Sequence, residues 1–164
     1  MPNIALAAFD FWLGVAVAAF LIFFSKRGYL YYLAMFPGTF LHEMAHYLVG
    51  LVCGARPRFK HLLPKKDKDG SWTLGCVVTN KSMIFDSFIA MAPFALHFLI
   101  VPAYVYTVDN LSGPWAVVSG YITAVGTWAA MPSVTDFKNA VYAPISTALL
   151  GAVGYFGWLM YSSQ

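Results

Sequence analysis

Long apolar runs alternate with short polar breaks along the chain. The first run extends over residues 4–24 and is interrupted only by Asp10. A transmembrane helix needs about 20 consecutive apolar residues, so this run predicts a helix that crosses a bilayer. The same reasoning predicts about five spans, at residues 4–24, 29–53, 83–106, 115–131 and 142–161. We therefore expect an all-α polytopic membrane protein whose residues 1–164 form a single membrane-embedded domain.

One polar segment, at about residues 56–80, separates the second span from the third. Its centre reads PKKDKDG and combines proline, aspartate and glycine, which is typical of a turn. The flanking residues 58–63 and 72–79 are rich in the β-branched and aromatic residues found in strands. The segment thus predicts a short β-hairpin lying against the membrane surface.

Composition supports a membrane protein. Hydrophobic residues make up 60% of the chain and charged residues 10%, whereas a soluble domain has about 25% charged residues. The net charge of +3 is concentrated in one loop, which argues for membrane topology and against nucleic-acid binding. Cys53 and Cys76 have neither metal-type spacing nor the pattern of a disulfide framework, so we expect both to be reduced and structural.

The distribution of basic residues predicts the orientation. Lys26 and Arg27 lie between the first two spans, and Lys138 lies between the last two. The polar loop holds seven more basic residues: Arg56, Arg58, Lys60, Lys65, Lys66, Lys68 and Lys81. Because cytoplasmic loops carry an excess of lysine and arginine, we expect the N-terminus, the hairpin and the Lys138 segment in the cytoplasm, with the C-terminus outside.

The second span contains the sequence HEMAH, residues 42–46, which matches the zinc-binding pattern HExxH. Helical spacing places His42 and His46 on one face, where both imidazoles can bind one Zn²⁺. Glu43 would then stand beside the metal and act as a general base on zinc-bound water that attacks a carbonyl. Glu43 is the only glutamate in the chain, and ionisable groups at membrane depth are costly and usually functional. This pattern indicates hydrolysis of a peptide bond.

A catalytic zinc usually has three protein ligands, and several residues of the sequence could supply the third. A second glutamate does not exist, and Val52 stands where a metzincin would have its third histidine. Topology favours Asp136, which follows the cytoplasmic end of the fourth span, but its spacing from Ser133 also fits a helix-capping box. The candidates are Asp10, Asp86, Asp109, Asp136, His61 and His97, of which Asp86 and His97 stay open beside Asp136.

These residues resemble those of the site-2 protease family of intramembrane zinc metalloproteases. That family has HExxH in one transmembrane helix, β-structure after it, a proline-containing motif in the next helix and an aspartate ligand from a later helix. The matches here are His42, Glu43 and His46, the predicted hairpin, the sequence APFA at residues 92–95, and Asp136. Leu96 and the sequence PSVTD at residues 132–136 depart from the family pattern. The chain is similar to a small, divergent member without an accessory domain.

The resemblance implies an intramembrane zinc endopeptidase with His42, His46 and Asp136 as zinc ligands and Glu43 as catalytic base. Its substrate would be a membrane protein or peptide, and its location a prokaryotic plasma membrane. An extended substrate could add to the edge of the hairpin at Trp72, Thr73, Leu74 and Gly75. The alternative is a non-catalytic membrane scaffold or partner-binding protein, in which a structural metal or polar cluster ties the helices together. The sequence leaves the oligomeric state open.

Overall fold

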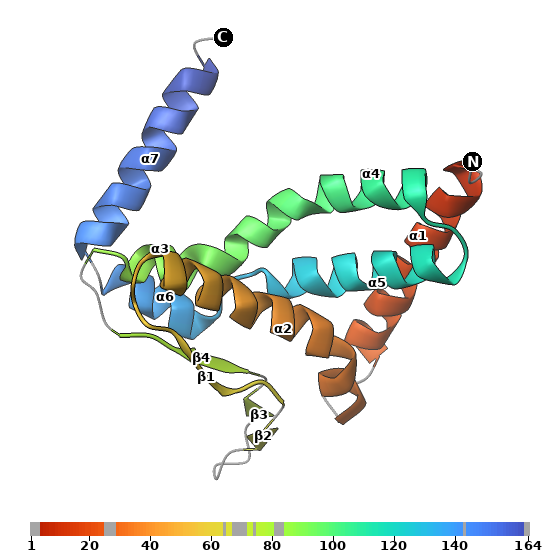
Figure 1. Ribbon diagram of the computed structural model, residues 1–164, viewed down its shortest axis with the longest axis horizontal. Coiled ribbons are helices and arrows are strands. Elements are labelled where there is room, and N and C mark those ends of the chain that lie inside the picture. Colours follow the sequence, from red (N-terminus) through yellow and green to blue (C-terminus); the bar gives the residue numbers. More distant parts are fainter. Residues whose placement is uncertain are drawn as a thin grey trace.

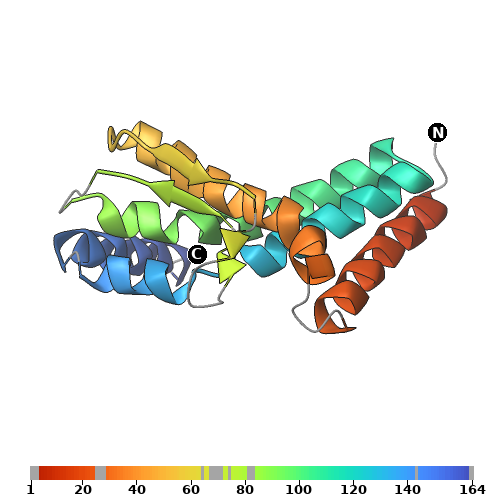
Figure 2. The ribbon, with the colours of Figure 1, turned by 90° about the horizontal axis from the view of Figure 1, so that it is seen from below.

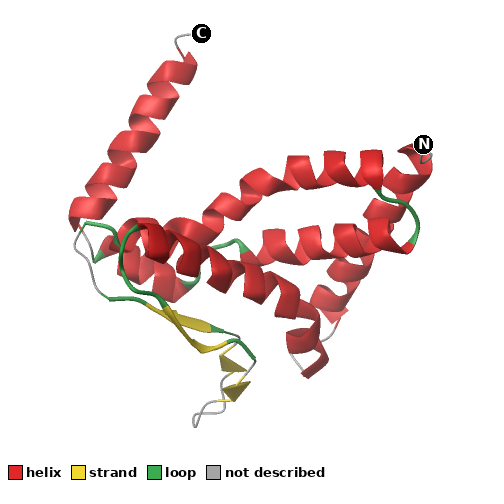
Figure 3. Ribbon diagram, viewed as in Figure 1, coloured by secondary structure: helices red, strands yellow, loops and turns green. Residues whose placement is uncertain are grey.

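Helices form most of the structure, which is a computed structural model (Figure 1; Figure 3). It describes residues 4–24, 29–63, 65–66, 72–73, 75–80, 84–142 and 144–162. In chain order the elements are α1 (Ile4–Phe24), α2 (Tyr29–Val52), β1 (Arg58–His61), β2 (Lys65–Lys66), β3 (Trp72–Thr73), β4 (Cys76–Val78), α3 (Asp86–Met91), the 3₁₀ helix η1 (Ala92–Leu99), α4 (Ile100–Asn110), α5 (Pro114–Ala129), α6 (Val134–Val141) and α7 (Pro144–Ser162). The expectation of a mostly helical chain is confirmed.

Four of the five predicted spans correspond to single helices, and the third does not. α1 matches its predicted range, α2 ends one residue earlier than predicted, and α5 and α7 differ from their ranges by one or two residues at each end. The third range is divided into α3, η1 and α4. Pro93 lies in the first turn of η1, and because a proline lacks the backbone donor of an α-helix, it favours a change of helix type there. The short helix α6 was not expected as an element of its own.

Two helical stretches among the described residues are long and apolar enough to cross a bilayer. They are Ile4–Phe24, with a mean hydropathy of 2.2, and Asp86–Asn110, with 1.9. Only 22% of each stretch is buried, and large side chains such as Phe9, Trp12 and Phe20 of α1 are mostly exposed. Exposed apolar surface of this extent marks an interaction with lipid or protein. A five-span arrangement stays a prediction, since α5 has only 16 residues.

Helix α1 packs along α5 (Figure 2). A Cβ atom at Gly14 would overlap the carbonyl oxygen of Val117, and one at Gly120 would overlap that of Phe11. Small residues permit this close approach of helices in membranes. Farther along both helices, Ala18 packs against Val125 in a core that includes Met35 of α2. The two helices therefore run in the same direction.

This direction corrects one feature of the predicted topology. Strict alternation of spans places Asp10 near the cytoplasmic face and Gly113 near the outer face. In the structure the Gly113 N–H donates to the Asp10 carboxylate at 3.0 Å. The N-terminal end of α1 thus lies beside the α4–α5 turn (Figure 1). Loop charges do not encode the glycine contacts that align α1 with α5, so counting them misses this arrangement.

Helix α2 crosses α5 and continues toward α6. A Cβ atom at Gly38 would overlap the carbonyl oxygen of Val125, and the Tyr121 hydroxyl donates to the carbonyl of Ala34 at 2.6 Å. On the far side, the Ser87 hydroxyl of α3 donates to the carbonyl of Ala140 in α6 at 2.7 Å. These contacts bring the C-terminal half of α2 next to the first turn of α6.

The predicted hairpin is present as two short strand pairs beside α2 (Figure 3). Strand β1 pairs antiparallel with β4, with Arg58 opposite Val78 and Phe59 opposite Val77. Strand β2 pairs with β3 farther out. Pro64 and residues 67–70 of the predicted turn lie outside the described residues. The Phe59 ring stacks on Tyr47 of α2 with their centroids 4.6 Å apart, which holds the inner strand pair against the helix.

Candidate metal centre

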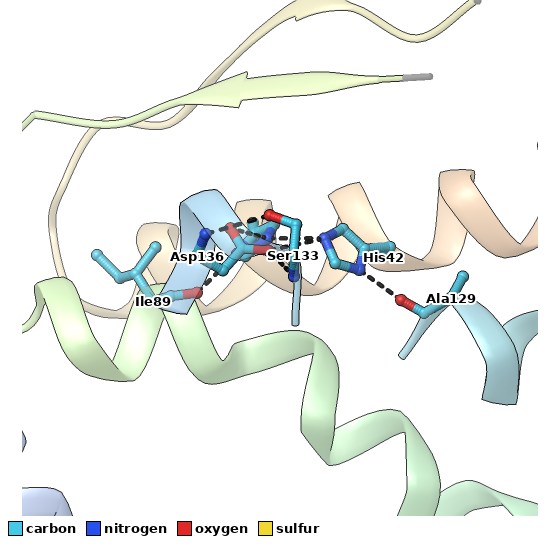
Figure 4. A network of polar contacts seen from close by, with 6 residues as sticks. His42, Ile89, Ala129, Ser133 and Asp136 are labelled. Atoms are coloured by element: carbon cyan, nitrogen blue, oxygen red, sulfur yellow. Dashed lines mark hydrogen bonds and ion pairs between the residues drawn. The ribbon is translucent and has the colours of Figure 1, made fainter. Parts of the chain in front are cut away.

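Three side chains from two helices converge between α2 and α6 (Figure 4). His42 and His46 come from successive turns of α2, and their Nε2 atoms lie 3.1 Å apart. The Asp136 carboxylate approaches from the first turn of α6, with Oδ2 3.4 Å from His42 Nε2 and Oδ1 3.3 Å from His46 Nε2. The structure thus brings together the three residues that the sequence predicts as metal ligands.

The outer nitrogen of each imidazole is bonded to a backbone carbonyl. His42 Nδ1 lies 2.6 Å from the carbonyl oxygen of Ala129, and His46 Nδ1 lies 2.7 Å from that of Ile89. A carbonyl only accepts, so each Nδ1 donates its proton to the carbonyl, and each ring turns Nε2 toward the other two groups. Metal-binding histidines are typically oriented by such a second hydrogen bond. No sequence pattern identified Ala129 or Ile89, since any residue offers a carbonyl.

The three side chains lie close enough together to share one small cation. The two Nε2 atoms are 3.1 Å apart, close to the separation of about 3.3–3.4 Å between neighbouring ligands of a tetrahedral zinc. His42 and His46 approach different oxygens of Asp136, and one ligand atom from each of the three residues lies within 4.8 Å of the others. The carboxylate and the two imidazole nitrogens would attract a cation placed between them. The donor set of two imidazoles and one carboxylate also suits zinc and leaves a fourth position for substrate or water.

Asp136 serves both as a helix cap and as a member of the cluster. The Ser133 N–H donates to Asp136 Oδ2 at 2.7 Å, and the Asp136 N–H donates to the Ser133 hydroxyl at 3.1 Å, which completes the predicted capping box. Burial raises the pKa of Asp136, but hydrogen bonds with His42, His46 and Ser133 outweigh burial and hold the pKa below its usual range. The carboxylate is therefore ionised at neutral pH, as a metal ligand must be.

Glu43 lies on the wall of a cavity of about 530 Å³ that the three ligand residues also line. Its side chain is largely buried, with a residue exposure of 8%. Helix α2, the C-terminal end of α5, the start of α6 and strand β4 form the walls, and Thr135 and Asn139 add polar groups from α6. Glu43 thus lines the same cavity as the candidate ligands, as a general base requires.

The other candidate ligands lie apart from the cluster. Asp10 accepts from Gly113, Asp109 is exposed in the last turn of α4, and His97 Nδ1 lies 3.1 Å from the carbonyl oxygen of Phe94. Asp86 begins α3, and His61 faces Cys76 across the hairpin. Among the described residues, His42, His46 and Asp136 form the one group of three such side chains close enough to share an ion.

Among the four hairpin residues predicted for substrate binding, Gly75 is the one that the structure describes at the cavity. Gly75 lines the cavity together with Cys76 and Val77. Trp72 and Thr73 pair with β2 in the outer strand pair, and their side chains lie outside the described residues, as does Leu74. A role of these three residues in substrate binding stays a prediction. Sequence alternation located the strand but not the face that meets α2.

Comparison with protein families, with characterised proteins and with solved structures finds no match to this chain. The likeness to site-2 proteases therefore consists of the residues quoted above and their expected arrangement. The geometry of the cluster is the stronger argument for function.

Proposed function

We propose that this protein is an intramembrane zinc metalloprotease that hydrolyses a peptide bond in or next to a membrane-embedded segment of its substrate. One observation carries the proposal: His42, His46 and Asp136 place one ligand atom each within 4.8 Å of the others, and the only glutamate of the chain lines the same cavity. A structural metal site would have no use for this open, polar cavity or for Glu43 beside it.

The chain's own residues supply distinct functions in this proposal. His42, His46 and Asp136 hold the ion, and the carbonyls of Ala129 and Ile89 fix the two imidazole rings. Bound zinc would polarise the scissile carbonyl and lower the pKa of water. Glu43 takes a proton from the attacking water and later delivers it to the leaving amine.

The membrane setting supplies the substrate class. The cluster lies in the half of α2 that leads into the basic hairpin, so the proposed site is near the cytoplasmic face, where water is available. We propose that the two apolar stretches Ile4–Phe24 and Asp86–Asn110 cross the bilayer and that the host membrane is a prokaryotic plasma membrane. A substrate helix must unwind before hydrolysis because its peptide bonds are shielded by internal hydrogen bonds.

Zinc content and turnover test the proposal together. Wild-type protein, purified in detergent, should hold about one zinc per chain, and His46→Ala and Asp136→Ala should hold close to none. Fluorescein-labelled casein serves as an unstructured probe of cleavage. Glu43→Gln should keep the zinc and lose at least about 10²-fold in turnover, within the range typical for removal of a general base. A wild type that holds no zinc refutes the proposal.

The non-catalytic scaffold makes the opposite prediction for Glu43→Gln. A scaffold has no turnover to lose, so wild type and Glu43→Gln would behave alike in the casein assay while both hold zinc. The residual signal in the Glu43→Gln sample also measures any contaminating protease.

A further inference from the structure

We infer that strand β4 positions the catalytic base, with Gly75 and the backbone N–H of Val77 holding the Glu43 side chain in place. This inference rests on the proposed function for the role of Glu43 but not for the contact itself. Gly75 and Val77 are positioning residues in this sense, since neither supplies a ligand atom to the cluster. The hairpin would then be part of the catalytic apparatus as well as a surface element.

Gly75 lies directly against the side chain of Glu43. A Cβ atom built on Gly75 would lie 2.7 Å from Cγ and 3.2 Å from Cδ of Glu43, and 3.2 Å from Cγ2 of Thr39. Real Cβ atoms do not approach carbon atoms as closely as 2.7 Å, because repulsion rises steeply inside van der Waals contact. Glycine thus lets the β4 backbone contact the Glu43 side chain directly, and any other residue at position 75 would displace Glu43 or the strand.

Val77 fixes the end of the same side chain. The backbone N–H of Val77 donates a hydrogen bond to the Glu43 carboxylate. Strand β4 has two edges: one pairs with β1, where Val77 stands opposite Phe59, and the other faces α2. Hydrogen bonds between an N–H and a carboxylate are stronger than those between neutral groups. The Glu43 carboxylate therefore accepts a hydrogen bond from the edge of β4 that faces α2.

The hairpin is tied to α2 at both ends of this contact, so β4 is fixed relative to Glu43. Phe59 stacks on Tyr47 one turn beyond Glu43, with 10° between the ring planes. The Asn80 N–H after β4 donates to the carbonyl of Ala55 at 2.8 Å. A glutamate has three rotatable bonds, and a support of this kind selects one conformation before substrate arrives.

Amide hydrogen exchange tests the contact without any assay of activity. In Glu43→Ala, exchange of the Val77 amide should accelerate by about tenfold or more, because a hydrogen bond to a charged acceptor is lost. His46→Ala serves as the matched control: it alters the cluster and removes zinc, yet leaves Glu43 in place, so the Val77 amide should stay protected. Equal exchange of this amide in wild type and Glu43→Ala overturns the inference.

Gly75→Ala tests the functional consequence. The variant should hold about one zinc per chain, and its kcat on labelled casein should fall by about 10²-fold, the typical cost of misplacing a reacting group by 1 Å, with KM within about twofold of wild type. Gly151→Ala is the matched control, since no atom lies within 4 Å of its added Cβ, and it should behave as wild type. An unchanged kcat, or a raised KM at unchanged kcat, contradicts positioning and assigns Gly75 to substrate contact or to structure.

The two experiments separate this inference from the proposed function. If the wild type holds no zinc and cleaves nothing, the protease proposal fails, and hydrogen exchange at Val77 still decides whether β4 holds Glu43. If zinc and turnover are present but the Val77 amide exchanges at the same rate in wild type and Glu43→Ala, the protease proposal is supported and the positioning role of the hairpin is wrong.

Discussion

Two helix contacts in this protein differ in the residues that form them: one is formed by glycines and the other by ionisable side chains. Helix α1 meets α5 through Gly14 and Gly120, whose missing side chains let backbone lie on backbone. Helix α2 meets α6 through two imidazoles and a carboxylate, each oriented by further hydrogen bonds. The first contact gains stability from close packing and offers no reactive group. The second gathers two imidazoles and a carboxylate in a buried cluster, so it provides groups for metal binding at a cost in desolvation.

The difference teaches that folding and metal binding depend on separate positions. Substitutions at the glycine contact should unfold the protein, whereas substitutions in the polar cluster should empty the metal site and leave the helices intact.

Replacement of Asp136 by alanine should remove zinc almost completely while the helical content is kept. The ligand set drops to two imidazoles, which is too few for a stable site, but the Ser87 hydroxyl still holds α6 through the carbonyl of Ala140. Elemental analysis and circular dichroism on the same sample measure the two properties. Zinc retained at about one per chain would move the third ligand elsewhere.

Replacement of Gly120 by leucine should have the reverse effect. The side chain would have to occupy the space of the Phe11 backbone, and overpacking of this kind costs about 1–3 kcal/mol or more in the free energy of unfolding. Thermal unfolding in detergent, followed by circular dichroism, should show a much lower midpoint than wild type. Gly154→Ala, which adds its Cβ to open space, is the control and should leave the midpoint almost unchanged.

Replacement of Ser133 by alanine should affect both properties to a smaller degree. Loss of an N-cap costs about 1 kcal/mol of stability. The Ser133 N–H still donates to the Asp136 carboxylate, but the Asp136 N–H loses the Ser133 hydroxyl as its acceptor, so the turn that carries the ligand is loosened and zinc affinity should fall by about 10-fold. Competition with a fluorescent zinc chelator measures the affinity. Val134→Ala, in the same helical turn at a position that is 74% exposed, is the control and should leave zinc affinity near the wild-type value.

The thiol of Cys76 reports the distance between β4 and Glu43. Burial raises its pKa, and the nearby negative charge of Glu43 raises it further. At a fixed pH near 9, Glu43→Gln should therefore lower the thiol pKa, increase the thiolate fraction and accelerate alkylation of Cys76 by iodoacetamide several-fold. Cys53, whose pKa is raised by burial alone, should react at the same rate in both proteins.

Local patterns accounted for most of the secondary structure. Apolar runs located α1, α2, α5 and α7 within two residues, and turn chemistry located the hairpin. These local patterns did not predict features that depend on contacts with distant parts of the chain. Such features are the division of the third run at Pro93, the parallel course of α1 and α5, and the separate helix α6. The capping spacing of Ser133 and Asp136 did signal where α6 begins.

The sequence by itself determined the chemistry of the candidate site. Helical periodicity places His42 and His46 on one face, and the scarcity of ionisable residues in an apolar chain singles out Glu43. Only the tertiary structure decided among Asp136, Asp86 and His97, because that choice depends on which helix ends meet. It also decided that β4 lies on Glu43, since a contact between Gly75 and residue 43 requires the hairpin to fold back on α2. The spacing of His42 and His46 along one helix is local geometry. The contacts of Asp136 and Gly75 with α2 instead join segments roughly 30 to 90 residues apart in the chain. Bringing such distant segments together costs chain entropy, which packing and hydrogen bonding must offset.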